Sequence, residues 1–191
     1  MAVPSILVFS GSARSGSYNG KLASLAAAEL AALGAKVKRI SLRDYDLPLY
    51  DGDLEAAEGV PEAAKALRAQ LWAHDAVFIA SPEYNSGYSP LLKNSLDWAS
   101  RGVSKPLLAG KLAALGGASP SWRGGLRGLI QARSMLELGL GAFVIPDMVM
   151  ITHANEAFDE AGALKDEGQS KQLKTAAERL VLEAGRAAAA H

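Results

Sequence analysis

The chain has 191 residues, 49% of them hydrophobic, with twenty basic and twenty acidic side chains and no cysteine. This length predicts a single domain, residues 1–191. The balanced charge gives no indication of nucleic-acid binding or of attraction to a membrane surface. The absence of cysteine excludes disulfides, thiolate metal sites and a cysteine nucleophile. Neither a leader segment nor a membrane-spanning apolar run is apparent, which favours a cytoplasmic protein.

The first informative stretch runs from Phe9 to Asn19, where an apolar strand ends in a loop rich in serine and glycine. Leucine and alanine follow at helical spacing from Leu22 onwards, so the pattern predicts strand, short loop and helix. Such a junction leaves backbone N–H groups unpaired, and the helix dipole there favours an anion. The candidate side chains for binding an anionic group are Ser10, Ser12, Arg14, Ser15, Ser17, Tyr18 and Asn19. The stretch therefore predicts a phosphate-binding loop.

The spacing within this loop restricts the kind of phosphate. Gly11 and Gly16 match the two P-loop glycines, but Ser17 and Tyr18 replace the Lys-Ser/Thr pair that a nucleotide triphosphatase needs. Ala13 stands where the dinucleotide fingerprint requires its second glycine. A terminal monophosphate, held by hydroxyl groups without a metal, fits best. The alternative is a strand-to-helix turn that binds nothing.

The next elements begin with a charged, alternating segment at 36–40, which predicts an edge strand. Residues 42–59 are acidic and interrupted by proline and glycine, which indicates an excursion over the surface. Helical spacing of Ala64, Leu67 and Leu71 predicts the following helix. The unbroken apolar run 76–80 then predicts a strand that is covered on both faces.

A second polar loop, 81–90, follows that strand. Pro82 and Pro90 are expected to fix its backbone, and Gly87 is expected to take a φ that other residues resist. Backbone groups held in this way can hydrogen-bond the polar edge of a heteroaromatic ring. Tyr84 and Tyr88 can pack against the ring or a substrate, and ordinary loop packing or a subunit contact is the alternative for both.

The last third of the chain predicts two more strands and two more helices. A strand at 111–116 leads to a third polar loop that contains Ser119, and helical spacing resumes at Leu129. A fifth strand is expected within 142–151, where Pro146 predicts a register break or an edge position. An apolar stripe from Leu173 predicts the final helix.

Strands that alternate with helices in this way predict an α/β fold with a five-stranded parallel sheet in the order 2-1-3-4-5. In this order the connections leave strands one and three on opposite faces, and a crevice opens at their carboxyl ends. The first polar loop follows strand one, and the second polar loop follows strand three. The sequence therefore predicts that the two loops form one site.

Two motifs resemble those of the NADPH-dependent FMN reductase family of flavodoxin-like proteins, which includes quinone, chromate and azo-dye reductases. The first motif is Gly11-Ser12-x-Arg14-x-x-Ser17-x-Asn19, and the second is Pro82-Glu83-Tyr84-Asn85-x-x-x-x-Pro90 with Lys93-Asn94 and Asp97. The resemblance implies a flavodoxin-like three-layer sandwich with non-covalent FMN, whose phosphate lies at Ser12, Arg14, Ser17 and Asn19. It also implies an isoalloxazine ring against Pro82, Glu83, Tyr84 and Asn85, with Ser119 near it. Lys93, Asn94 and Asp97 are interpreted as helix-anchoring and interface residues.

The resemblance implies that NAD(P)H reduces the flavin and leaves, and that a quinone, chromate, azo or flavin acceptor takes its place in a ping-pong exchange. Neither a catalytic triad nor a metal is needed. Family members are commonly dimers or tetramers, so a homodimer or homotetramer is expected. The alternatives are a flavodoxin-type electron carrier, which the neutral net charge disfavours, and a non-catalytic FMN-binding module.

The sequence allows alternative roles for several charged and aromatic residues. The candidates for contact with the 2′-phosphate of NADPH are Arg14, Lys38, Arg39 and Arg123, and none of them stands in a diagnostic motif. Trp122 in the third loop either covers the ring or packs elsewhere. His153 follows the fifth strand near the carboxyl edge of the sheet, and it is either a catalytic residue or an ordinary loop histidine.

Overall fold

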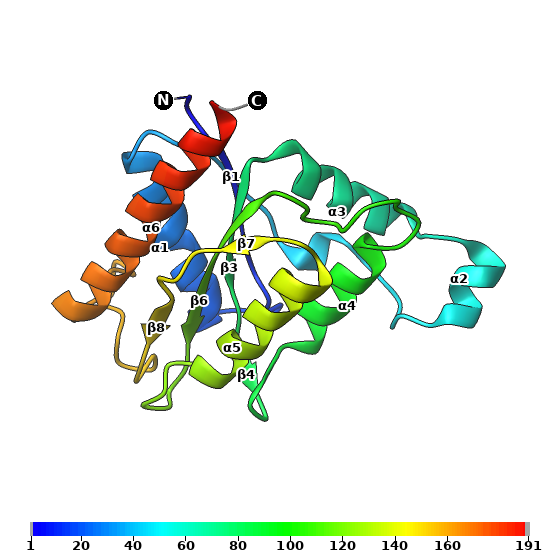
Figure 1. Cartoon of the computed structure of the whole chain (residues 1–191). Helices are drawn as coiled ribbons and strands as arrows, with labels where there is room; N and C mark the ends of the chain where they lie inside the picture. The colour runs from blue at the N-terminus through cyan, green and yellow to red at the C-terminus, as the bar shows by residue number, and fades with distance from the viewer. Residues whose placement is uncertain (1, 190–191) are drawn as a thin grey trace.

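The computed structural model describes residues 2–189, and Figure 1 shows a central sheet between two layers of helices. The strands of the main sheet are β1 (Ser5–Ser10), β2 (Lys36–Arg39), β3 (Ala76–Ala80), β6 (Leu112–Ala118), β7 (Phe143–Val144) and β8 (Val149–Ile151). Their order is β2-β1-β3-β6-β7, with β8 also beside β6, and all pairings are parallel. The predicted order 2-1-3-4-5 is therefore confirmed, with β2 at the edge.

The fifth position of the sheet is divided between two short strands. β7 pairs with the start of β6, where Leu112 lies opposite Phe143, and β8 pairs with its end, where Gly116 lies opposite Val149. Pro146 lies between the two strands and has no N–H to donate to the sheet. The expected register break at Pro146 is confirmed.

In the part of the chain that the structure describes, six α-helices and two short helical turns surround the sheet. The helices are α1 (Tyr18–Ala32), α2 (Gly52–Glu58), α3 (Glu62–Ala73), α4 (Pro90–Ala99), α5 (Leu126–Ser134) and α6 (Glu167–Ala188). The turns are a 3₁₀ turn, η1 (Leu42–Asp44), and a π-helical turn, η2 (Met135–Gly139), which continues α5. Within residues 2–189, no helix has both the length and the apolar character that crossing a membrane requires.

The alternation of side chains along β3 explains the three layers. Phe78 points to one face and packs in the cluster that includes α1 and α6, whereas Val77 and Ile79 point to the other face, which α3, α4 and α5 cover. All five residues of β3 are buried, as predicted for a strand covered on both sides. The three-layer sandwich is confirmed.

The surface excursion after β2 contains more structure than the sequence predicted, because η1 and α2 lie within it. Asn94 of α4 fastens this segment: its Oδ1 accepts a hydrogen bond from the Tyr50 backbone at 2.8 Å, and its Nδ2 donates to the Pro48 carbonyl at 2.8 Å. Asn94 therefore anchors the excursion to α4.

Candidate functional site

The predicted phosphate loop, residues 10–17, packs directly against the start of α4. Ser89 caps α4 by accepting a hydrogen bond from the Leu92 N–H, and its hydroxyl donates to the carbonyl of Gly11. A Cβ at Gly11 would lie 2.9 Å from Ser89 Oγ and 3.2 Å from Leu92 Cβ. The glycine therefore permits the contact between the loop after β1 and the helix that follows the second loop.

Asn19 joins the phosphate loop to β6. Its Nδ2 donates to the Ala118 carbonyl and its Oδ1 accepts from the Ala118 N–H, both at 2.9 Å, and the residue is 3% exposed. A buried amide requires such partners. This side chain therefore braces the loop against β6 through its Oδ1 and one Nδ2 hydrogen, and donation of the second Nδ2 hydrogen to a phosphate stays a prediction.

Serine hydroxyls in the loop are oriented by the backbone. Ser10 Oγ accepts from the Ser12 N–H at 3.1 Å, Ser12 Oγ accepts from the Arg14 N–H at 3.4 Å, and Ser17 Oγ accepts from the Gly20 N–H at 3.3 Å. Because each oxygen acts as an acceptor, its hydrogen stays available to an outside acceptor. Ser17 is also the N-cap of α1.

Backbone N–H groups of the loop provide further donors. Within the described residues, no protein acceptor pairs with the N–H of Ala13, Ser15, Gly16, Tyr18 or Asn19. The last two belong to the first turn of α1, where no intrahelical partner exists. The combination of free N–H groups, free hydroxyl hydrogens and a helix N-terminus suits a phosphate group without a metal.

Arg14 and Tyr18 lie at the rim of the loop. The Arg14 guanidinium is exposed and lies 5.5 Å from the centre of the Tyr18 ring. Tyr18 stacks on Phe158, with ring centres 6.5 Å apart and planes within 4°. Arg14 thus packs on Tyr18, which packs on Phe158, and the guanidinium can still reach an anion in the loop.

The second loop folds as a small hairpin of β4 (Glu83–Tyr84) and β5 (Gly87–Tyr88). Asn85 and Ser86 connect the strands with φ values of 50° and 70°. Positive φ at both central residues is the geometry of a two-residue type I′ connection. The expectation that Gly87 supplies the unusual φ is wrong, because the preceding two residues adopt it and Gly87 belongs to a strand.

Glu83 caps a helix that is distant in the sequence. α5 begins after Gly125, which has φ 90° and no side chain that can cap. Glu83 Oε2 accepts from the backbone N–H groups of Arg127 at 2.9 Å and Gly128 at 3.2 Å, and Glu83 Oε1 pairs with the Arg127 guanidinium. The carboxylate therefore does what an N-cap side chain does, from another segment.

Burial acts to raise the pKa of Glu83, but the hydrogen bonds from Arg127 and Gly128 outweigh it and leave the pKa below its ordinary value. The carboxylate is ionised at neutral pH and fully occupied with α5. The Glu83 side chain is therefore not available to a ligand, whereas the hairpin backbone and the half-exposed ring of Tyr84 are.

The third loop lies beside the second. A Cβ at Gly117 would lie 2.8 Å from the Gly124 carbonyl and 3.3 Å from the Ser81 carbonyl, so the end of β6 fits closely between the two loops. Ser119 donates its N–H to Ile151 at 3.0 Å, and its Oγ accepts from the Ser121 N–H at 3.2 Å.

Trp122 and His153 lie on the surface near the third loop. Trp122 is 67% exposed, and the Arg123 guanidinium lies 4.3 Å from the centre of its ring. His153 is exposed, with a φ of 47°. Neither side chain is packed into this chain's core, and neither lines the cavity described next.

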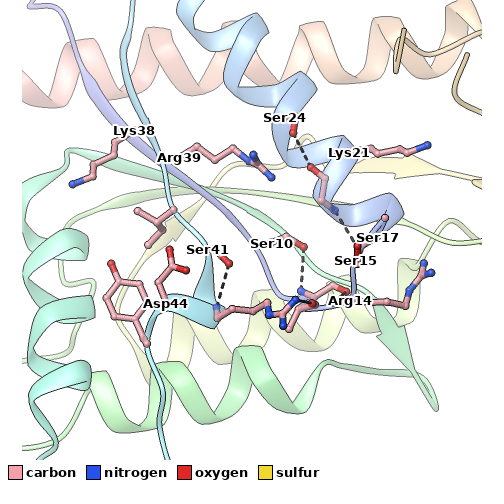
Figure 2. Close-up of a pocket in the computed structure, with 17 residues that line it drawn as sticks. Ser10, Arg14, Ser15, Ser17, Lys21, Ser24, Lys38, Arg39, Ser41 and Asp44 are labelled. Carbon is pink, nitrogen blue, oxygen red and sulfur yellow. Dashed lines mark hydrogen bonds between the residues drawn. The ribbon is translucent and has the colours of Figure 1, made fainter. Parts of the chain in front are cut away.

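A cavity of about 790 Å³ adjoins the phosphate loop (Figure 2). Its lining includes five of the predicted phosphate-binding residues, Ser10, Ser12, Arg14, Ser15 and Ser17. It extends from there to the end of β2 and η1. The predicted ring contacts, 82–85 and Ser119, do not line this cavity.

Comparison with known proteins identifies the family. A profile described as NADPH-dependent FMN reductase matches residues 4–156, which include all three loops. The chain belongs to the NADPH-dependent FMN reductase family. The predicted resemblance is thereby confirmed, and the phosphate loop and the hairpin are the parts of this family member that carry the two motifs.

Individual relatives cover most of the chain. An NAD(P)H-dependent FMN reductase of Pseudomonas aeruginosa is 41% identical over 164 residues, 85% of each chain. A quinone reductase of Escherichia coli is 33% identical over 170 residues, 88% of each chain. Among solved structures, FerB, a flavoenzyme NAD(P)H:(acceptor) oxidoreductase from Paracoccus denitrificans, has a TM-score of 0.77 and 32% identity, covering 96% of this chain and 98% of FerB. The fold of this FMN reductase family member is flavodoxin-like.

Proposed function

We propose that this protein is an FMN-dependent oxidoreductase, built as a single flavin-binding domain, that transfers reducing equivalents from NAD(P)H to a small-molecule acceptor of the quinone type. The observation that carries the proposal is the phosphate loop, whose free N–H and hydroxyl groups lie at the start of α1 in a chain of an FMN reductase family. The quinone class is supported by the relatives named quinone reductase.

In this proposal Ser12, Arg14 and Ser17 bind the FMN phosphate, while Ser10 supports the loop and Tyr18 supports Arg14. When bound there, FMN would supply the redox chemistry between NAD(P)H and the acceptor. The hairpin backbone at 82–85 and Ser119 hold the ring between the second and third loops. The role of these residues is to position and orient, so no triad of catalytic side chains is needed.

The visible spectrum of the purified protein tests the proposal. We expect flavin absorption that NADPH bleaches under anaerobic conditions, together with steady NADPH oxidation when a benzoquinone is added. Flavin that is bound without turnover would instead indicate an electron carrier. A protein that stays colourless after addition of FMN would refute the proposal altogether.

The position of the phosphate is tested by the double variant Arg14→Ala, Ser17→Ala. Charge-assisted hydrogen bonds contribute about 1.5–3 kcal/mol each, so losing two weakens FMN binding by about 100-fold or more. Lys36→Ala with Asp166→Ala is the matched control, because Asp166 caps α6 as Ser17 caps α1 and both control residues lie outside the cavity lining. Unchanged FMN affinity in the first variant would place the phosphate elsewhere.

We further propose a homodimer or homotetramer in the cytoplasm. Several large apolar side chains are exposed, among them Leu49 at 80%, Leu138 at 88% and Phe143 at 65%. Such side chains are typical of contact surfaces when they gather. Light scattering coupled to gel filtration checks the assembly, and a monomer over the working concentration range would contradict it. Cell fractionation checks the location.

A further inference from the structure

The cavity beside the phosphate loop is larger than one phosphate group requires. Beyond the loop, its wall is formed by the outer side of α1 and by residues at the end of β2 and the start of η1. The lining residues on which the argument depends are Arg39, Ile40, Ser41, Arg43 and Tyr45. Since the hairpin 82–85 is not part of this lining, the cavity extends away from the predicted ring position, toward the edge of the sheet.

The charge around the cavity is strongly one-sided. Its lining contains Arg14, Lys21, Lys38, Arg39 and Arg43 but only one acidic residue, Asp44. None of these five basic side chains forms an ion pair with another described residue. In a chain with no net charge, this local excess of positive charge favours an anion in addition to the phosphate of FMN.

The side chains differ in where their charges lie. Figure 2 shows Arg39 extending from β2 toward α1, whereas Lys38 extends away from α1. Arg14 and Lys21 are directed at aromatic rings, with their charged groups 5.5 Å and 5.4 Å from the centres of the Tyr18 and Phe158 rings. Arg39 is thus the cation that reaches across the cavity.

Arg43 connects the wall at η1 to the phosphate loop. Its Nη1 donates to the Ala13 carbonyl at 3.1 Å, which leaves the remaining N–H groups of the guanidinium available. Ser41 Oγ accepts from the Arg43 N–H at 3.3 Å, so its hydroxyl hydrogen is free, as are those of Ser10 and Ser17 (Figure 2). Arg43 and Ser41 thus keep donors free in the cavity that Arg39 also lines, and donors of these kinds can bind a phosphate monoester.

An apolar side adjoins these donors. Ile40 and Tyr45 are partly buried, pack against the core and border the cavity. Burial, with a smaller contribution from Asp44, raises the pKa of Tyr45, so the ring stays uncharged at neutral pH. A flat purine base can lie on such a surface. Phosphate donors beside an apolar wall fit a phosphorylated nucleoside.

The place of Arg39 in the fold narrows the choice of nucleoside. A carboxylate accepts a hydrogen bond from a ribose 2′-hydroxyl, whereas an arginine guanidinium binds a 2′-phosphate. Here β2 ends at Arg39, with no acid beside it before Asp44. The chemistry at this position therefore suits adenosine 2′-phosphate.

We propose that this cavity binds the 2′-phosphoadenosine end of NADPH and that Arg39, assisted by Arg43, is the residue that selects NADPH over NADH. The inference rests on the proposed function, since it assigns the NADPH end of the same reaction. It also resolves the four candidates named from the sequence: Lys38 points away, Arg123 lies on Trp122 in another loop, and Arg14 serves the FMN phosphate.

The kinetic test compares kcat/KM for NADPH and NADH in the wild-type flavoprotein, in Arg39→Ala and in Arg39→Lys. Loss of charge-assisted hydrogen bonds to a phosphate predicts that the NADPH:NADH ratio falls by about 10- to 100-fold in Arg39→Ala, with partial recovery in Arg39→Lys. Lys36→Ala is the matched control, because Lys36 lies on β2 but outside the cavity lining, and it should keep the wild-type ratio. An unchanged ratio in Arg39→Ala refutes the proposal.

Calorimetry with 2′,5′-ADP provides a readout that does not depend on turnover. We expect 2′,5′-ADP to bind the wild-type protein, and its affinity for Arg39→Ala to be lower by about 10-fold or more. The affinity of the wild-type protein for 5′-AMP, which lacks the 2′-phosphate, should be lower still. Equal affinity of wild type and Arg39→Ala for 2′,5′-ADP, or no binding to the wild type, overturns the assignment. A wild-type protein without flavin or turnover contradicts the proposed function instead, and the calorimetric result still decides the cavity's ligand.

Discussion

Glu83 connects the β4–β5 hairpin to α5, and Glu83→Gln removes its charge while it keeps its shape. In the wild type one carboxylate oxygen faces two backbone N–H groups, of Arg127 and Gly128, and the other faces the Arg127 guanidinium. A glutamine must direct its NH₂ group at one of these pairs of donors. Two hydrogen bonds are lost, because the glutamine NH₂ group then faces either the two backbone N–H groups or the guanidinium, all of which are donors.

The magnitude follows from the burial of the two partners. Hydrogen bonds to a charged group contribute about 1.5–3 kcal/mol each, but the Arg127 side chain is 50% exposed, so solvent screens its share. The Glu83 side chain itself is 9% exposed. We therefore expect Glu83→Gln to lower the free energy of unfolding by about 2–3 kcal/mol at neutral pH.

The stabilisation that Glu83 provides should also depend on pH. The pKa of Glu83 is lowered in the folded state, so the carboxylate stabilises the fold above its unfolded pKa, and this stabilisation is lost as the pH falls through the folded pKa. The stability difference between wild type and Glu83→Gln should thus be largest at neutral pH and shrink in acid.

Urea unfolding of flavin-free protein, followed by far-UV circular dichroism, measures the difference without a contribution from ligand binding. Glu178→Gln is the control, because Glu178 is exposed on α6 and forms none of the ion pairs among the described residues. Equal stability of wild type and Glu83→Gln at neutral pH, or a difference that does not change between about pH 7 and about pH 3.5, would refute the reasoning.

Two further substitutions test the packing between the loops. Gly128→Ala places a Cβ 2.9 Å from the Gly87 carbonyl, so overpacking of about 1–3 kcal/mol should exceed the helix-propensity gain of about 1 kcal/mol; Gly139→Ala, which enters open space, should show no loss in the same thermal scan. Asn19→Ala removes both hydrogen bonds to Ala118 and should lower the free energy of unfolding by about 2–4 kcal/mol, with an unchanged urea midpoint as the contradicting result.

The main elements of the fold could be predicted from local sequence. The apolar run of β3 predicted its bounds, Pro146 predicted the interruption between β7 and β8, and the serine-rich stretch after β1 predicted the loop at the start of α1. These features depend on neighbouring residues, because strand burial, proline chemistry and helix capping act over a few positions.

The hairpin at 83–88 shows where local reasoning failed. Proline and glycine indicated a rigid loop correctly, but the positive φ was assigned to Gly87 and lies at Asn85 and Ser86. The two-residue connection is selected by the pairing of Glu83 and Tyr84 with the residues that follow, and this pairing is stabilised by docking on α5. A single glycine in the sequence does not reveal that register.

The sequence predicted the order of strands and helices and the serine-rich loop before α1, because each of these elements follows from residues close together in the chain. Only the three-dimensional structure shows that Glu83 caps α5, that Asn19 pairs with Ala118 of β6, and that Arg39 lines a cavity shared with the phosphate loop. These contacts join segments tens of residues apart, and their partners are defined only when the sheet order brings the segments together.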